Sequence, residues 1–329
     1  MKRLHAVLLA FLALGSGLSA ASAEDKYPSK PIKIILPYGA GSATDIITRI
    51  MCDQLRQVIG QPCVVENKPG AFGIIAIEEM AHAKPDGYTL QVGNVSTNAI
   101  TPVLFKNRFK IDYQKDVVAV ARIGDLPSFL MATTKNFPPN TLAEVIAYAK
   151  ERPGKLKYAS PGAGSFPHYD TEILSKRAGI SMQVIHIKAG PPGYINDMTL
   201  GDIQLAFMNV ATSTPQIKAG TLKPIVTTSD SRVPEYPDVP TMAEAGFPGV
   251  GTTLWAGLFA PAGTPTPVLE TLQKAVLQTL KSQPILESYA RQSIRSKPTA
   301  TLAEAQSWLN NEIASWQKIT SEIKIDLTD

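Results

Sequence analysis

A glycine-rich loop near the amino terminus carries the clearest potential for binding chemistry. The segment Leu36–Asp45 (LPYGAGSATD) follows a short apolar run and precedes a helical pattern. Its glycines permit a tight turn that leaves backbone amides uncovered, and the positive end of the helix dipole lies beside them. The alternative is a plain tight turn in which Thr44 or Asp45 caps the helix. The pattern predicts an anion-binding loop whose candidate residues are Tyr38, Gly39, Gly41, Ser42, Thr44 and Asp45.

Two further loops also combine glycine with small polar side chains. Segment 159–168 (ASPGAGSFPH) also joins a predicted strand to a predicted helix, and segment 93–98 (GNVSTN) follows another strand. In open α/β sheets ligands bind outside the carboxyl ends of the strands, where these loops belong. We therefore expect the loops to face one another and to hold a carboxylate mainly through neutral hydrogen bonds. Their candidate binding residues are Asn94, Ser96, Thr97, Ser160, Gly162, Gly164, Ser165, Phe166 and His168.

Catalytic interpretations have less support. The sequence has no Gly-x-Ser-x-Gly elbow and no phosphate-binding Gly-Lys-Ser/Thr motif. An exported enzyme that uses His168 or Asp45 as a base remains an alternative hypothesis. A dinucleotide site is another, with Glu66 as the acid that binds the ribose, but Thr44 stands where the third glycine of that motif belongs.

Neither a metal nor a cofactor is expected. The histidines beyond the amino terminus, at 82, 168 and 186, are scattered and do not have metal-ligand spacing. The two cysteines, Cys52 and Cys63, fall on a predicted helix and on the strand that follows it. An even number of cysteines permits a disulfide in an oxidising compartment, whereas two buried thiols would act as small apolar side chains. Both possibilities remain open.

The composition and charge argue against several classes of protein. The 329 residues are 44% hydrophobic and 18% charged, which is too apolar for a disordered chain. The formal net charge is +4 without any basic block, so a nucleic-acid partner is not expected. Apolar runs are too short for a membrane-spanning helix.

The first 23 residues have the pattern of a secretory leader. Lys2 and Arg3 precede an apolar stretch, and the small residues Ala21–Ala23 offer a cleavage site after Ala23. No cysteine follows for lipid attachment. Cleavage would remove two positive charges and send the mature chain to the bacterial periplasm.

Strands and helices alternate along the rest of the chain. Continuous apolar strands separated by helices predict mostly parallel sheets covered on both faces. The predicted strands are 32–36, 63–65, 88–92, a strand-rich stretch at 117–131, then 157–159, 183–187, 203–207, 223–227 and 255–260. The predicted helices are 45–59, 74–83, 141–152, a short one from Thr241 to Gly246, then 267–281, 284–292 and 301–323.

The order of these elements predicts an α/β protein of two units. A helical tail without strands of its own must return to cover the first unit, so the second unit is inserted into it. The predicted division is a leader at 1–23, one lobe at 24–125 and 250–329, and another at 126–249.

Several strings along the chain form a recognisable set: YPSKPI at 27–32, PYGAGSATD at 37–45, VVENKPGA at 64–71, PDGYTL at 85–90, KAG at 218–220, PDVPT at 237–241 and GLFAPAGTP at 257–265. At this spacing they resemble one known family, the TctC or Bug-type periplasmic receptors of tripartite tricarboxylate transporters.

The resemblance implies a monomeric, two-lobed binding protein of the periplasmic Venus-flytrap type, without catalytic activity. It would capture a small carboxylate and deliver it to a membrane transporter of the tripartite tricarboxylate type; a sensory receptor needs the same form. The family's other pocket loops match Lys188–Gly193 and Asn209–Thr212, which add Gly190 and Asn209 to the candidates. Phe166 and Met208 depart from the family pattern and suggest a ligand with an apolar or aromatic body.

Overall fold

One sheet forms from the short apolar strands at both ends of the chain. Its strand order is β11-β4-β10-β3-β1-β2, and β1, β3, β4 and β10 are almost wholly buried. The computed structural model describes residues 27–325 and 327, so the leader predicted at 1–23 lies outside the described residues. The strands are β1 (Ile32–Leu36), β2 (Cys63–Asn67), β3 (Thr89–Asn94), β4 (Val117–Leu126), β10 (Leu254–Pro261) and β11 (Arg295–Ser296).

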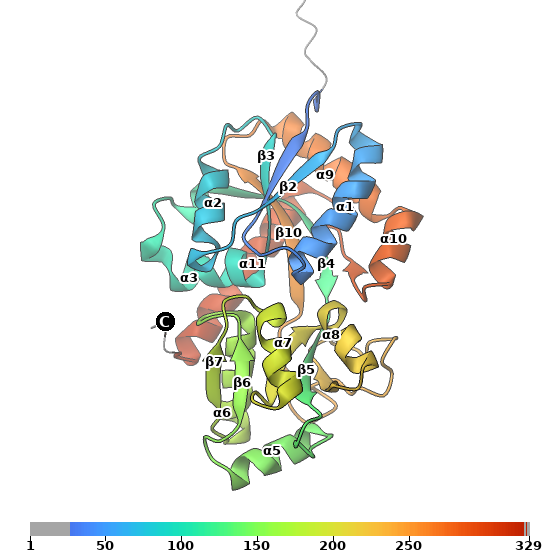
Figure 1. Ribbon diagram of the computed structural model, residues 1–329. Coiled ribbons are helices and arrows are strands. Elements are labelled where there is room, and N and C mark those ends of the chain that lie inside the picture. Colours follow the sequence, from blue (N-terminus) through green and yellow to red (C-terminus); the bar gives the residue numbers. More distant parts are fainter. Residues whose placement is uncertain (1–26, 326, 328–329) are drawn as a thin grey trace, which may run out of the picture.

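A second sheet forms from the middle of the chain, with the order β7-β6-β8-β5-β9. Figure 1 shows the two sheets in separate lobes, the first in blue and orange above and the second in green and yellow below. The two-lobed α/β architecture expected from the sequence is confirmed. The strands of the second lobe are β5 (Ser128–Thr133), β6 (Lys157–Ser160), β7 (Gln183–His186), β8 (Leu205–Asn209) and β9 (Leu222–Thr227).

Both sheets are mixed, although the sequence pattern predicted mostly parallel ones. In the first sheet β10 runs antiparallel to β3 and β4, and in the second β5 runs antiparallel to β8 and β9. Strand β5 enters the second lobe and β10 re-enters the first, each starting at the junction where the neighbouring strands end. The antiparallel direction of β5 and β10 therefore follows from the insertion of one lobe into the other.

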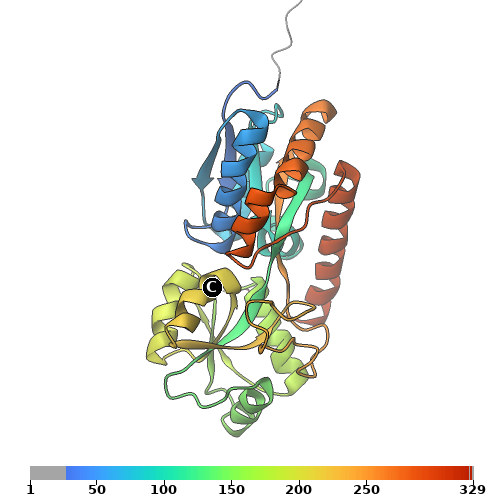
Figure 2. The ribbon, with the colours of Figure 1, turned by 90° about the vertical axis from the view of Figure 1, so that its right-hand side faces the viewer.

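Helices cover both faces of each sheet (Figure 2). Along β8, Leu205 and Phe207 pack into one apolar cluster, while Ala206 and Met208 pack into another on the opposite face. No helix within residues 27–325 has the length and apolar character to cross a membrane. The helices are α1 (Ala43–Ile59), α2 (Ile74–Ala81), α3 (Thr101–Leu104), α4 (Tyr113–Asp116), α5 (Leu142–Glu151), α6 (Phe166–Ala178), α7 (Pro191–Leu200), α8 (Val210–Lys218), α9 (Thr266–Leu280), α10 (Gln283–Ala290) and α11 (Leu302–Glu322), with short η1 (Ala71–Gly73), η2 (Ser96–Ile100) and η3 (Lys106–Arg108).

One predicted helix is instead a turn. The Thr241 hydroxyl accepts from the Glu244 amide at 3.1 Å and the Glu244 carboxylate accepts from the Thr241 amide at 2.7 Å, as in a capping box. Gly246, with a φ of 88°, ends the segment after a single turn. So short a segment leaves no room for a second turn, and one turn alone is not a stable helix.

The chain passes between the lobes twice. The first passage is Pro127, between the last residue of β4 and the first of β5. The second is the long segment between Thr227 and Leu254, which a buried carboxylate holds. Asp170 of α6 accepts hydrogen bonds from the Thr252 amide at 2.8 Å and from its hydroxyl at 2.7 Å.

Candidate functional site

The loop after β1 folds around the amino terminus of α1. Gly41 has a φ of 79°, a conformation that suits glycine because it has no Cβ. Ser42 caps the helix, and its hydroxyl accepts from the Asp45 amide at 3.2 Å. The amides of Ala43 and Thr44 lie in the first turn, where no carbonyl of the helix can reach them. They are donors that this loop can offer to an anion.

Asp45 is buried beneath the loop and holds its shape. Gly41 N donates to Oδ2 at 3.0 Å, Arg49 Nε donates to both oxygens at 2.9–3.0 Å, and Asn67 Nδ2 donates to Oδ1 at 2.9 Å. Burial alone would raise the pKa of Asp45, but these hydrogen bonds outweigh it and lower the pKa below its usual value. An ionised carboxylate with both oxygens engaged is a poor general base, and Arg49 neutralises its charge.

Asn67 is a site residue that the sequence reasoning missed. It ends β2, and its Nδ2 also donates to the Tyr38 carbonyl at 2.9 Å, while its Oδ1 accepts from Arg49 at 2.9 Å. The available signal was its place in the VVENKPGA string, to which no role was assigned. Asn67 ties the end of β2 to the first loop, whose Gly39 is exposed with open space around it.

The first loop is joined to the loop after β3 by a buried polar network. The Tyr38 hydroxyl donates to Asn94 Oδ1 at 2.5 Å and lies 3.1 Å from Thr97 Oγ1. Asn94 Nδ2 donates to Thr44 Oγ1 at 2.9 Å, and Asn94 Oδ1 accepts from the Ser96 amide at 2.9 Å. Burial raises the pKa of Tyr38, so its hydroxyl stays a neutral donor.

The second glycine-rich loop is held by its own hydroxyls. Ser160 Oγ donates to the Gly162 carbonyl at 3.0 Å and lies 3.0 Å from Ser165 Oγ, which donates to the same carbonyl at 2.8 Å. The φ angles of Gly162 and Gly164, 151° and 79°, require glycine or strain. The hydroxyls of the two serines are therefore engaged in hydrogen bonds that hold the loop in shape.

His168 lies on α6 behind this loop and is 4% exposed. Its Nδ1 accepts from the Gly164 amide at 3.4 Å. Its ring lies 4.9 Å from that of His186, edge to face, and 6.2 Å from that of Tyr158. These contacts give His168 a structural role in supporting the loop.

The loops of the two lobes touch. The Phe166 amide of α6 donates to Ser96 Oγ of the other lobe at 3.2 Å. A Cβ on Gly164 would stand 2.9 Å from the Leu104 side chain, and a Cβ on Gly162 would stand 3.9 Å from the Phe72 ring. The structure thus brings all three predicted loops to one junction between the lobes.

The remaining candidates flank this junction. Asn209 Nδ2 donates to the Leu126 carbonyl at 3.3 Å and to Ser128 Oγ at 2.9 Å, so it holds the first passage between the lobes. Gly190 precedes α7, and a Cβ there would lie 4.0 Å from Pro161.

The two bulky side chains that suggested an apolar ligand are both buried in cores. Phe166 packs into the apolar cluster of the first lobe, and Met208 packs inside the second. Their burial gives both side chains a packing role, and the apolar or aromatic ligand body stays a prediction.

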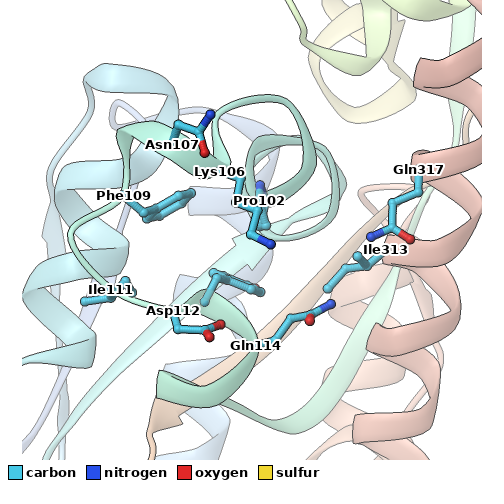
Figure 3. A pocket seen from close by; sticks show the side chains of 10 residues that line it. Pro102, Lys106, Asn107, Phe109, Ile111, Asp112, Gln114, Ile313 and Gln317 are labelled. Carbon is cyan, nitrogen blue, oxygen red and sulfur yellow. The ribbon is translucent and has the colours of Figure 1, made fainter.

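A separate pocket of about 360 Å³ lies within the first lobe. In Figure 3 the Ile313 and Gln317 side chains of α11 face the 102–114 segment across it. None of the glycine-rich loops lines it, and Asp112 at its edge pairs with Lys115 at 3.0 Å. Over residues 27–325 and 327 no group of three or more metal-binding side chains gathers, here or elsewhere.

Comparison with known proteins gives a consistent result. Residues 47–325 match the model of the tripartite tricarboxylate transporter family receptor, TctC. The chain is also 30% identical over 322 residues to protein BugT of Bordetella pertussis, with 98% of each chain covered.

Solved structures are similar over nearly the whole chain. Rpa4515 of R. palustris, solved with adipate, has a TM-score of 0.83 and 29% identity, over 90% of this chain and 97% of that one. MatC of Rhodopseudomonas palustris, solved with malate, has a TM-score of 0.80 and 28% identity, over 89% of this chain and 99% of that one.

Proposed function

Because the chain belongs to the tripartite tricarboxylate transporter receptor family, we propose that it binds a small carboxylate between its lobes and delivers it to a transporter of that type. The observation that carries the proposal is the meeting of the second glycine-rich loop with the 93–98 loop of the other lobe, joined by the Phe166–Ser96 hydrogen bond. The Tyr38–Asn94 hydrogen bond ties that 93–98 loop to the first glycine-rich loop. Each glycine-rich loop stands at the amino terminus of a helix, which favours an anion. We further propose that the mature protein is a monomer, exported after removal of residues 1–23.

The candidate donors are neutral. Asp45 and Arg49 cancel one another beneath the first loop, so a ligand carboxylate would meet backbone amides, hydroxyls and the Tyr38–Asn94 network. Such hydrogen bonds to an ionised ligand are stronger than neutral ones. Since two similar proteins were solved with adipate and malate, dicarboxylates are the ligands to test first.

Ligand entry requires the lobes to separate. The lobes approach closely at this edge, since a Cβ on Gly164 would stand 2.9 Å from the Leu104 side chain and one on Gly162 would stand 3.9 Å from the Phe72 ring. We propose that residues 24–125 and 250–329 move as one lobe and 126–249 as the other, about the passage at Pro127 and the segment near Thr252. The strand membership of the two sheets supports this division.

Calorimetry and thermal shift with adipate, malate, citrate and benzoate would test the proposal on the mature protein. A ligand that binds only the native state raises the melting temperature, and mass spectrometry should recover it unchanged. Absence of binding to any small carboxylate would refute the receptor role, and product formation would support the enzyme alternative.

Gly41→Ala and Gly60→Ala form a matched pair for the site. Both glycines have positive φ, 79° and 71°, and open space around the position of a Cβ, so the backbone cost is similar. Gly41 lies in the first loop, whereas Gly60 ends α1 at its far end. We expect Gly41→Ala to weaken carboxylate binding by about tenfold or more, or roughly 1.4 kcal/mol, and Gly60→Ala to leave it unchanged.

A further inference from the structure

The two cysteines of the sequence lie against each other in the first lobe. Cys52 is in the middle of α1 and is 5% exposed, while Cys63 is the first residue of the edge strand β2 and is partly exposed. In the structure both are thiols, and both pack on the same apolar cluster. The two thiols are close enough for each to shift the pKa of the other.

The two thiols differ in exposure and in acidity. The interaction with Cys63, reinforced by burial, raises the pKa of Cys52. The same interaction lowers the pKa of Cys63 against the opposing effect of burial. Asp53 raises both pKa values and Arg49 lowers that of Cys52. The partly exposed thiol of Cys63 is therefore both the more accessible and the more easily ionised of the two.

We propose that Cys52 and Cys63 form a disulfide when the folded protein meets an oxidising thiol–disulfide couple, and that this bond fastens α1 to β2. The Cys63 thiolate attacks one sulfur of an external disulfide, breaking its S–S bond and releasing one thiolate. Cys52 then loses its proton and attacks Cys63 Sγ in the mixed disulfide, releasing the second thiolate. One S–S bond breaks and one forms, and the external disulfide takes up two electrons and leaves as two thiols.

The bond would leave the site loops untouched. Cys63 pairs with Ile32 at the opposite end of the sheet from Asn67 and the first loop. Cys52 lies nine residues beyond Ala43, which is about 14 Å along the helix. The inference stands apart from the proposed function, because it needs only oxidising conditions.

Thiol counting tests the bond directly. The mature protein, held in excess oxidised glutathione and then quenched, denatured and treated with N-ethylmaleimide, should take up no label and should weigh two hydrogens less than the reduced protein. The reduced protein should take up two labels. Two labels after oxidation, or a stable glutathione adduct on the wild-type chain, would overturn the proposal in favour of two inert buried thiols.

Single substitutions test the order of attack. With its partner removed, the Cys63 of Cys52→Ser should be captured as a glutathione adduct, whereas the buried Cys52 of Cys63→Ser should react much more slowly. Equal adduct formation by the two variants would contradict the assigned roles.

The melting temperature tests whether the disulfide stabilises the folded protein. We expect the oxidised wild type to melt roughly 5 °C above the reduced wild type, because the bond restricts the unfolded chain. The Cys52→Ala/Cys63→Ala double variant should melt at the same temperature under both conditions. Equal melting temperatures for the oxidised and the reduced wild type would mean that the disulfide does not stabilise the lobe.

Discussion

At the scale of single residues, the most informative side chain is Asp45, a carboxylate placed beside a loop built to attract anions. Its charge would repel a ligand if it were exposed, but it is 3% exposed and bonded to Arg49, Asn67 and the Gly41 amide. Its role is to hold the loop in shape at the amino terminus of α1.

Asp45→Asn should destabilise the protein by about 1–3 kcal/mol at neutral pH, because it removes a buried, charge-assisted set of hydrogen bonds. Since the folded pKa of Asp45 is lowered, its stabilisation is present above the unfolded pKa and is lost as the pH falls through the folded one. Urea unfolding at pH 7 and at pH 3 checks this, with a larger difference between wild type and variant expected at pH 7.

Asp53→Asn is the matched control. It lies on the same helix but is exposed, so its unfolding free energy should stay close to that of the wild type. An equal loss in both variants would mean that the hydrogen bonds of Asp45 contribute no particular stability.

At the scale of elements, helix α6 connects the second loop to the passage between the lobes. Its first turn carries Phe166 and His168 of the site. Asp170, two residues after His168, accepts hydrogen bonds from Thr252 of the second passage. The adjacent Tyr169 ring lies 5.5 Å from that of Trp316 on α11. The same helix therefore contacts the loop, the second passage and α11 of the first lobe.

Asp170 should make the stability depend on pH. Burial raises its pKa to about 7, although the hydrogen bonds from Thr252 oppose the shift. A raised folded pKa gives stability that is complete below the unfolded value and is lost as the pH rises through 7. Relative to Asp170→Asn, the wild type should lose about 2–3 kcal/mol of unfolding free energy between pH 5 and pH 8.

Asparagine suits this comparison because its carbonyl can accept from the Thr252 amide and its NH₂ can donate to the Thr252 hydroxyl. Asp202→Asn, at an exposed position of the same lobe, is the control and should reproduce the wild-type pH profile. If the Asp170→Asn profile also parallels the wild type, then Asp170 does not titrate in this range.

Sequence reasoning predicted most elements but missed the short α3, α4 and β11 and the longer α7 and α8. Both longer helices contain prolines that are usually read as loop signals: Pro191 and Pro192 open α7, where the first turn tolerates them, and Pro215 lies inside α8. Packing of Tyr194 and Val210 into the second lobe overrides that local signal.

The three loops of the candidate site could be predicted from the sequence, but the hydrogen bonds within and between them could not. The glycine spacing and the position after strands identified the loops, and the Ser96–Phe166 hydrogen bond joins two of them. The internal use of Ser160 and Ser165 depends on how the loop closes. Asn67 has a role only because β2 ends beside Asp45, which no local pattern reports.

At the scale of the whole molecule, the lobes meet through small residues on one side and large ones on the other. Gly164 faces Leu104 and Phe105 of the first lobe, while α11 of the first lobe reaches α6, where Lys176 Nζ donates to the Glu322 carbonyl at 3.2 Å. The absence of a side chain at Gly164 lets the lobes approach.

Gly164→Ala should disturb the contact between the lobes, because its Cβ would stand 2.9 Å from Leu104 Cδ1 and either that side chain or the lobes must shift. We expect a larger radius of gyration in small-angle scattering and weaker carboxylate binding. Gly154→Ala has a similar positive φ, 68°, with nothing within 4 Å of its Cβ, and should change neither quantity. Adding Leu104→Ala to Gly164→Ala should restore part of the compactness, and a failure to do so would assign the effect to backbone strain.

The place of β10 in the first sheet has a consequence for the order in which the chain acquires its shape. This strand lies between β3 and β4, yet it is made only after the whole second lobe. Until Leu254–Pro261 emerges, β3 and β4 have open edges and the first lobe lacks its central strand. The second lobe can thus form while the first is still incomplete. The first lobe, although it begins near the start of the chain, gains its β10 strand only from the last quarter of the sequence.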